Sequence, residues 1–203
     1  MIAILDYKMI NLGSVTNMLR HVGAKDVKVV TTPEELSKAQ KIFLPGIGAF
    51  DNAMKNLADM NLIETLRHKA LLEKVPVLGI CLGMQLLTKS SEEGSASGLG
   101  LIPARTLKFK FEDKKLKVPH MGWNRVICPN SGPLFDKTQN GSRFYFVHSY
   151  YVQCEKPENV MLATQYGLEF ASGIVLDNIF GVQFHPEKSH SYGKEMFRRF
   201  LKI

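Results

Sequence analysis

The first half of the chain alternates short apolar runs with stretches of helical periodicity. The apolar runs have the length of buried strands and occupy residues 2–5, 27–30, 41–44 and 75–80. Helical spacing relates the apolar positions Leu12, Val15, Leu19 and Val22, which precede Gly23. Thr32 and Pro33 predict a second helix start, and helical patterns fill residues 51–73 with an interruption near Asn61. This alternation predicts an α/β fold with a central, mostly parallel sheet flanked by helices.

The second half has shorter alternating apolar segments and more turn residues. After a polar loop at residues 90–100, strands are expected around 107–111, 118–128, 144–154 and 182–184. We expect these to join the same sheet as antiparallel or mixed strands. A last apolar stripe at residues 196–201 predicts a C-terminal helix. Without a repeat or linker, the sequence predicts one domain over residues 1–203.

The charge and cysteine content of the sequence limit the kinds of function that the chain can have. The net charge is +7, but the basic residues are dispersed, and the one cluster at 108–117 also contains Glu112 and Asp113. A basic face toward an acidic partner or a phosphorylated substrate is therefore expected, rather than nucleic-acid binding. Three widely spaced cysteines predict a reducing compartment, the cytoplasm, without a zinc site. No apolar run approaches the ~20 residues of a membrane span, and neither a metal nor a cofactor is expected.

A cysteine stands where the fourth apolar run meets a helix. The segment 79–83 reads Gly-Ile-Cys-Leu-Gly, so Cys81 has a glycine two residues away on each side. A nucleophile elbow requires such small neighbours, because its turn is sharp and strained. The helix start behind Cys81 favours a thiolate. Cys81 is therefore the predicted nucleophile.

A thiol nucleophile needs a base and a group that orients the base. His185 ends an apolar strand pattern, and Glu187 follows it by two residues across Pro186. In an extended segment, side chains two residues apart project to the same side. We therefore expect Glu187 to hold one imidazole nitrogen while the other faces Cys81.

Acyl transfer also needs donors for an oxyanion. The backbone N–H of Leu82, directly after the nucleophile, is the first predicted donor. The second is expected from the loop Gly46-Ile47-Gly48, which ends the preceding strand at the same sheet edge. The sequence also leads us to expect that this loop turns its N–H away until a partner binds.

Three segments carry a resemblance to a known family. The motifs GICLGMQLL, PGIG and GVQFHPE resemble, in sequence order, those of the class I (triad) glutamine amidotransferases. From the residues alone, the prediction is a Cys-His-Glu hydrolase or acyl transferase. The resemblance implies glutamine as the substrate: Cys81 would form a glutamyl thioester, and His185, oriented by Glu187, would move the protons.

Within this family, the chain most resembles the glutaminase subunits of imidazole glycerol phosphate synthase, an enzyme of histidine biosynthesis. PGIGAF and residues 119–124 and 145–150 carry this likeness. It implies a cytoplasmic heterodimer with a (β/α)₈ cyclase subunit, to which ammonia passes and which performs the lyase step. Its implied substrate-binding residues are Gly46, Gln85, His148, Ser149 and Tyr150. Its implied partner-facing residues are Asn11, Trp123 and Tyr145, while His120 and His148 are expected to be structural or to position the backbone.

Several alternatives stay open at this point. The family commonly has glycine near position 8, where this chain has Lys8. Some paralogues supply ammonia to a sugar amidotransferase of surface-polysaccharide synthesis, and this chain is compatible with that role. Core packing is the alternative for Trp123. A non-catalytic interaction subunit and a papain-like thiol hydrolase are the remaining hypotheses.

Overall fold

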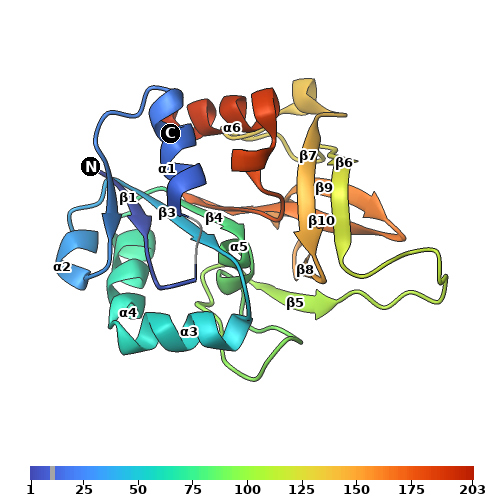
Figure 1. Cartoon of the computed structure of the whole chain (residues 1–203), viewed down its shortest axis with the longest axis horizontal. Helices are drawn as coiled ribbons and strands as arrows, with labels where there is room; N and C mark the ends of the chain where they lie inside the picture. The colour runs from blue at the N-terminus through green and yellow to red at the C-terminus, as the bar shows by residue number, and fades with distance from the viewer. Residues whose placement is uncertain (10–11) are drawn as a thin grey trace.

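A twisted sheet crosses the molecule, with helices on both of its faces (Figure 1). The structure is a computed structural model that describes residues 1–9 and 12–203. Over these residues the sheet consists of β1 (Ile2–Leu5), β2 (Val27–Val30), β3 (Lys41–Gly46), β4 (Val77–Cys81), β5 (Ala104–Lys108), β8 (Tyr150–Cys154), β9 (Val160–Tyr166), β10 (Leu168–Leu176) and β11 (Ile179–Val182). The strand order is β2-β1-β3-β4-β11-β10-β8-β5, and β9 pairs with β10.

The strands from β2 through β11 in this order are parallel, whereas β5, β8, β9 and β10 add antiparallel pairs. Parallel neighbours need long crossover connections, and helices provide them here. Both halves of the predicted fold class, a mostly parallel sheet and added antiparallel strands, are therefore confirmed.

The helices are α1 (Leu12–His21), α2 (Pro33–Leu36), α3 (Phe50–Asp59), α4 (Leu62–Arg67), α5 (Leu82–Leu86) and α6 (His190–Lys202). A π-helical turn, η1 (His68–Leu72), extends α4, and single 3-10 turns occur at η2 (Lys137–Gln139), η3 (Pro157–Asn159) and η4 (Pro186–Lys188). Thr32 caps α2 as predicted, because its hydroxyl accepts from the Glu35 N–H. Asn61 has φ of +55°, which explains the interruption between α3 and α4.

Alternate strand residues divide the core into two layers. Ala3 and Leu5 face a layer shared with α3 and α4, whereas Ile4 faces a layer shared with α1 and α6. Aromatic rings are concentrated in the second layer: Phe43 packs edge-on against Phe200, with ring centroids 4.9 Å apart. The first layer is mainly aliphatic. Among the residues the structure describes, no helix is long and apolar enough to cross a membrane.

The structure corrects two expectations for the second half. Strands β6 (His120–Arg125) and β7 (Arg143–His148) pair with each other as a separate two-stranded sheet, not within the main sheet. Residues 144–154 contain two strands, because the chain leaves β7 at Ser149 and enters the main sheet as β8. Apolar alternation specifies which side of a strand is buried, but not which neighbour it pairs with.

Candidate active site

Cys81 lies at a strained turn between β4 and α5. Its φ of +55° and ψ of −110° are rare for a residue that carries a side chain. The flanking glycines make the turn possible, since a Cβ at Gly83 would lie 1.6 Å from the Leu44 carbonyl oxygen. A Cβ at Gly79 would lie 2.6 Å from the carbonyl oxygen of Gly83. The predicted elbow geometry is present, and the catalytic role of Cys81 stays a prediction.

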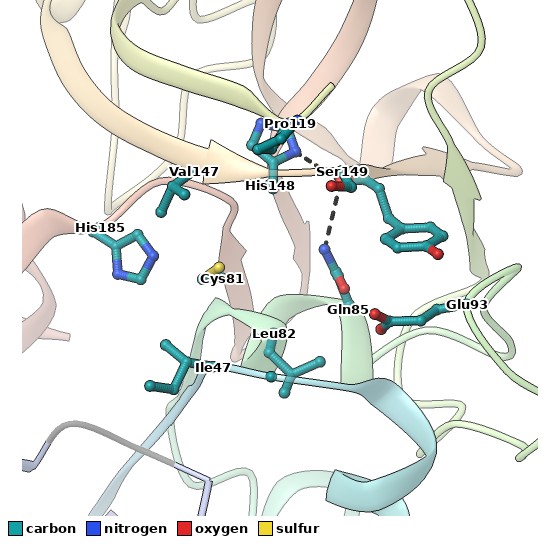
Figure 2. Close-up of a pocket in the computed structure, with 12 residues that line it drawn as sticks. Ile47, Cys81, Leu82, Gln85, Glu93, Pro119, Val147, His148, Ser149 and His185 are labelled. Carbon is teal, nitrogen blue, oxygen red and sulfur yellow. Dashed lines mark hydrogen bonds between the residues drawn. The ribbon is translucent and has the colours of Figure 1, made fainter. Parts of the chain in front are cut away.

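Parallel pairing brings the three motifs to one edge of the sheet. Gly46 at the end of β3 is in register with Cys81, and Val182 at the end of β11 is in register with Ile80. A cavity of about 370 Å³ opens at this edge. Figure 2 shows side chains from all three motifs around it. It is lined by Ile47, Gly48, Cys81, Leu82, Gln85, Glu93, Pro119, Val147, His148, Ser149, Tyr150 and His185.

His185 and Glu187 form a buried pair at the cavity wall. His185 Nδ1 lies 2.7 Å from Glu187 Oε1, as expected, although Glu187 sits in the 3-10 turn η4 rather than in extended backbone. The predicted extended backbone at Glu187 was therefore wrong, but the predicted contact between Glu187 and His185 is present. His185 Nε2 is buried without a partner among the described residues, and the ring lies beside Cys81 (Figure 2).

The environment of His185 favours its protonated form. Burial alone lowers the pKa of the imidazole, but the neighbouring Cys81 and Glu187 outweigh burial and raise that pKa. An imidazolium beside a thiol stabilises the thiolate form of the sulfur. The pair is therefore suited to nucleophilic catalysis with Cys81.

The predicted oxyanion loop is held in a particular orientation. The Ile47 N–H donates to the Met9 carbonyl oxygen at 2.7 Å, so this donor is already occupied. The Tyr7 hydroxyl donates to the Pro45 carbonyl oxygen at 2.7 Å, and Gly48 has φ of +98°. Met9 and Tyr7 both belong to the loop after β1. That loop therefore occupies the Ile47 N–H, whereas Leu82 and Gly48 line the cavity.

The predicted substrate-binding residues converge, with one exception. Gln85, His148, Ser149 and Tyr150 line the cavity. Gln85 Nε2 donates to the Tyr150 carbonyl oxygen at 3.5 Å (Figure 2). Gly46 does not line the cavity. A Cβ at Gly46 would lie 2.0 Å from the Tyr7 hydroxyl oxygen, which gives this glycine a packing reason.

Two polar residues of the site were not predicted: Glu93, which lines the cavity, and Gln183, which contacts Cys81 and Gln85. Glu93 is half-buried, and its carboxylate accepts from the Phe50 N–H at 2.9 Å; Figure 2 places it next to Gln85. Gln183 is fully buried, and its Nε2 lies 3.7 Å from Cys81 Sγ while its Oε1 accepts from Gln85. Gln183 belongs to the GVQFHPE segment, which was a usable signal. Glu93 stands in the polar loop, where no spacing rule distinguishes it from Glu92.

The predicted partner-facing residues lie on the β6–β7 sheet. Trp123 is 39% exposed, which excludes core packing for this residue. Tyr145 is half-buried and lies edge-on to Trp123, with ring centroids 6.2 Å apart. Asn11 lies outside the described residues. Lys8 has φ of +66°, so the backbone at this position favours glycine even though the chain has lysine.

A thiol at a strained elbow, beside a histidine that a carboxylate orients, is suited to chemistry through a thioester. The family model of the class-I glutamine amidotransferases matches residues 3–203, and the chain belongs to this family. It is accordingly a glutamine amidotransferase.

Three cysteines are present, and within the described ranges no group of His, Cys, Asp and Glu side chains could hold a metal ion.

Three relatives that align along the whole chain are named as subunits of imidazole glycerol phosphate synthase. The chain is 52% identical to imidazole glycerol phosphate synthase subunit HisH 2 of Methanococcus maripaludis, with 100% of this chain and 99% of the relative aligned. It is 43% identical to subunit HisH 2 of Pseudomonas aeruginosa and 46% identical to subunit HisH 1 of Campylobacter jejuni, each with 100% of both chains aligned.

Solved structures share the fold at lower identity. PurLQS from Thermotoga maritima matches with a TM-score of 0.76 and 21% identity, covering 99% of this chain and 97% of that one. A structure described as glutamine amidotransferase matches with a TM-score of 0.73 and 16% identity, covering 99% and 97%. At such identities the likeness supports the fold alone.

Proposed function

We propose that this chain is the glutaminase subunit of an imidazole glycerol phosphate synthase in histidine biosynthesis. It hydrolyses L-glutamine to glutamate and ammonia, and the ammonia passes to a partner subunit. The observation that carries the proposal is that Cys81 and His185 line one cavity while Glu187 holds His185 through its Nδ1. The names of relatives aligned along the whole chain support the pathway.

The geometry suggests how the side chains divide the chemistry. The Cys81 thiolate attacks the side-chain carbonyl carbon of glutamine, and His185 gives a proton to the departing nitrogen, which leaves as ammonia. Neutral His185 then takes a proton from water, the resulting hydroxide attacks the thioester, and glutamate leaves as the thiol re-forms. Glu187 keeps Nδ1 protonated, so that Nε2 is the nitrogen facing the thiol.

The opposite end of the cavity suits an amino acid backbone. The Glu93 carboxylate has the charge to bind the α-ammonium group of glutamine, and Gln85 lies beside it (Figure 2). We assign the α-carboxylate to the backbone at Ser149 and Tyr150, which line the same cavity. These assignments orient the side-chain amide of glutamine toward Cys81.

The occupied Ile47 N–H leads us to propose control by the partner. Until this N–H leaves the Met9 carbonyl, the oxyanion has only part of its donor set. The partner we propose is a (β/α)₈ cyclase that forms a cytoplasmic heterodimer by docking at Trp123 and Tyr145. The ammonia enters the lyase reaction of that cyclase. We propose that docking shifts the Ile47 peptide toward the cavity.

Replacing the nucleophile tests the activity. With the cyclase present, we expect Cys81→Ala to reduce glutamate release by at least about 10³-fold, because the thioester cannot form. Cys154→Ala is the matched control, since burial raises the pKa of the Cys154 thiol to about 12 and keeps it unreactive. A glutamine-like electrophile should label Cys81 alone.

The outcomes separate the alternatives. Full activity in Cys81→Ala contradicts the mechanism, and absence of selective labelling favours a non-catalytic subunit. Hydrolysis of peptides but not of glutamine favours a thiol protease. If the chain copurifies with a sugar amidotransferase instead of a cyclase, the ammonia is used in surface-polysaccharide synthesis rather than in histidine biosynthesis.

A further inference from the structure

Two buried histidines outside the catalytic pair form a continuous chain of hydrogen bonds. His148 Nδ1 lies 2.7 Å from the Tyr150 carbonyl oxygen, and His148 Nε2 lies 2.9 Å from His120 Nδ1. His120 Nε2 lies 3.2 Å from Asn124 Nδ2, which also donates to the Gln165 carbonyl oxygen at 3.0 Å. His120 and His148 are 3% and 5% exposed, so these contacts replace contacts with water.

In this chain of hydrogen bonds, only one arrangement of the protons makes every contact a donor–acceptor pair. The Tyr150 carbonyl only accepts, so His148 carries its proton on Nδ1 and accepts at Nε2. His120 must then carry its proton on Nδ1 and accept at Nε2 from the Asn124 amide. The Asn124 orientation agrees, because its Oδ1 accepts from the Arg125 N–H at 2.8 Å. A proton added to either histidine would set two donors against each other.

The surroundings keep both rings neutral and fixed. Burial lowers the pKa of His120 to about 4 and that of His148 to about 3. The His120 ring also stacks on Tyr166, with ring centroids 4.0 Å apart. Neither histidine is needed for proton transfer at Cys81, because His185 and Glu187 already supply that chemistry.

The chain of hydrogen bonds runs from the cavity wall to the β6 strand. The inner end holds the Tyr150 carbonyl, which forms part of the cavity wall and also accepts from Gln85 (Figure 2). The outer end is Asn124 on β6, directly after the exposed Trp123. His120 and Asn124 lie on one side of this strand, and Trp123 lies on the other.

We propose that His120 and Asn124, acting through His148, are positioning residues that hold the Ser149–Tyr150 backbone in the orientation that binds glutamine. This inference rests on the proposed glutaminase function of the cavity. It assigns His120 a role in substrate affinity, without contact with the substrate. Disrupting the chain therefore affects the KM for glutamine more than kcat.

Tautomers provide a test that needs no activity. In the full chain labelled with ¹⁵N at histidine, we expect the nitrogen shifts of His120 and His148 to report neutral rings protonated at Nδ1 at pH 6. Loss of one set of signals in His120→Phe assigns them. An Nε2-protonated tautomer or an imidazolium at either position would overturn the proposed direction of the chain.

Kinetics in the complex with the partner provide the second test. His120→Phe keeps a ring against Tyr166 but removes both hydrogen bonds, so we expect the KM for glutamine to rise about tenfold. His120→Asn retains a donor at the δ position and should restore most of that loss, with kcat within about twofold throughout. Asn124→Ala, at the outer end, should raise KM by about two- to threefold.

A KM unchanged in both His120→Phe and Asn124→Ala, with normal thermal melting, would overturn the positioning role. If the Phe variant fails to fold, Asn124→Ala decides alone. A complete lack of glutaminase activity in the wild-type complex would instead contradict the proposed function, and the tautomer measurement would still decide the structure of the chain.

Discussion

At the scale of single residues, charge placement inside the cavity distinguishes neighbours that look alike in the sequence. Glu92 and Glu93 are adjacent, yet only Glu93 lines the cavity. Glu92 accepts from the Lys108 N–H at 2.7 Å, outside the cavity. Among the described residues that line the cavity, Glu93 carries the one carboxylate. It is therefore the side chain there suited to an ammonium group.

We expect Glu93→Gln to weaken glutamine binding. The substitution removes the charge but keeps an oxygen for the Phe50 N–H, so the fold should be retained. Losing a hydrogen bond to a charged group corresponds to about 2 kcal/mol, or a KM raised about thirtyfold. Steady-state glutamate release measures this, with Glu92→Gln as the matched control. Equal KM values for the two variants would contradict the assignment.

The buried histidine pair predicts a pH dependence of stability. The pKa values of His120 and His148 are about 4 and about 3 in the folded chain, against an ordinary value of 6.5. Below pH 6.5 the unfolded chain binds protons that the folded chain rejects, so stability falls as pH falls toward 4. His185 offsets only a small part of this loss: its raised pKa of about 10 keeps it protonated in the folded chain, while the unfolded residue gains its proton as pH falls from 7 to 5.

Together the two histidines should reduce the free energy of unfolding by about 3 kcal/mol between pH 7 and pH 5. Urea denaturation at pH 7, 6 and 5 measures the slope. His120→Phe should remove about half of the difference, since it leaves one titrating histidine. An identical slope in wild type and variant would show that other groups cause the acid sensitivity.

At the scale of elements, the β4–α5 elbow was readable from sequence because its constraint is local. Two glycines around Cys81 predict a strained turn, and the backbone has one. The β6–β7 sheet was not readable in the same way, since its pairing connects residues far apart in the chain. At residues 186–188 the missed feature was local: Pro186 begins a 3-10 turn, in which the Lys188 N–H donates to the His185 carbonyl oxygen, in place of extended backbone.

The elbow predicts a sharp sensitivity to one methyl group. In Gly83→Ala the new Cβ would meet the Leu44 carbonyl oxygen at 1.6 Å, so β3 and α5 must separate. We expect a loss of about 3 kcal/mol or more in unfolding free energy, together with loss of activity. Gly132→Ala is the control, because no heavy atom lies within 4 Å of its Cβ position. Similar melting temperatures for the two variants would contradict this account.

At the scale of the whole molecule, strand order assembles the site, and a separate two-stranded sheet carries the proposed docking face. β4 lies between β3 and β11, so the elbow, the Ile47 loop and His185 meet at one edge of the sheet. The β6–β7 sheet presents Trp123 and Tyr145 beside basic groups: the Arg143 guanidinium lies 6.0 Å from the Trp123 ring and the Lys188 amine 5.8 Å from the Tyr145 ring. This face suits an acidic partner surface.

Removing the exposed indole should separate docking from folding. We expect Trp123→Ala to weaken binding of the cyclase by about 2–4 kcal/mol, because aromatic side chains often dominate interfaces. Partner-stimulated glutamate release should fall in parallel, since the Ile47 N–H then stays on Met9. Titration calorimetry measures the affinity. Leu72→Ala, which removes another exposed apolar side chain at 73% exposure, is the control and should leave binding unchanged. Unaltered affinity in Trp123→Ala would contradict the proposed docking face.

The sequence by itself determined the features that depend on neighbours in the chain. These are the strand and helix periodicities, the strained turn at Cys81, and the two-residue spacing that brings Glu187 to His185. Only the tertiary structure decided the features that depend on distant segments. It placed Glu93 at the cavity and Gln183 beside Cys81, paired the Ile47 N–H with the Met9 carbonyl, and linked His120 to His148. Periodicity records which side of an element is buried, whereas contacts across the fold depend on how the elements pack.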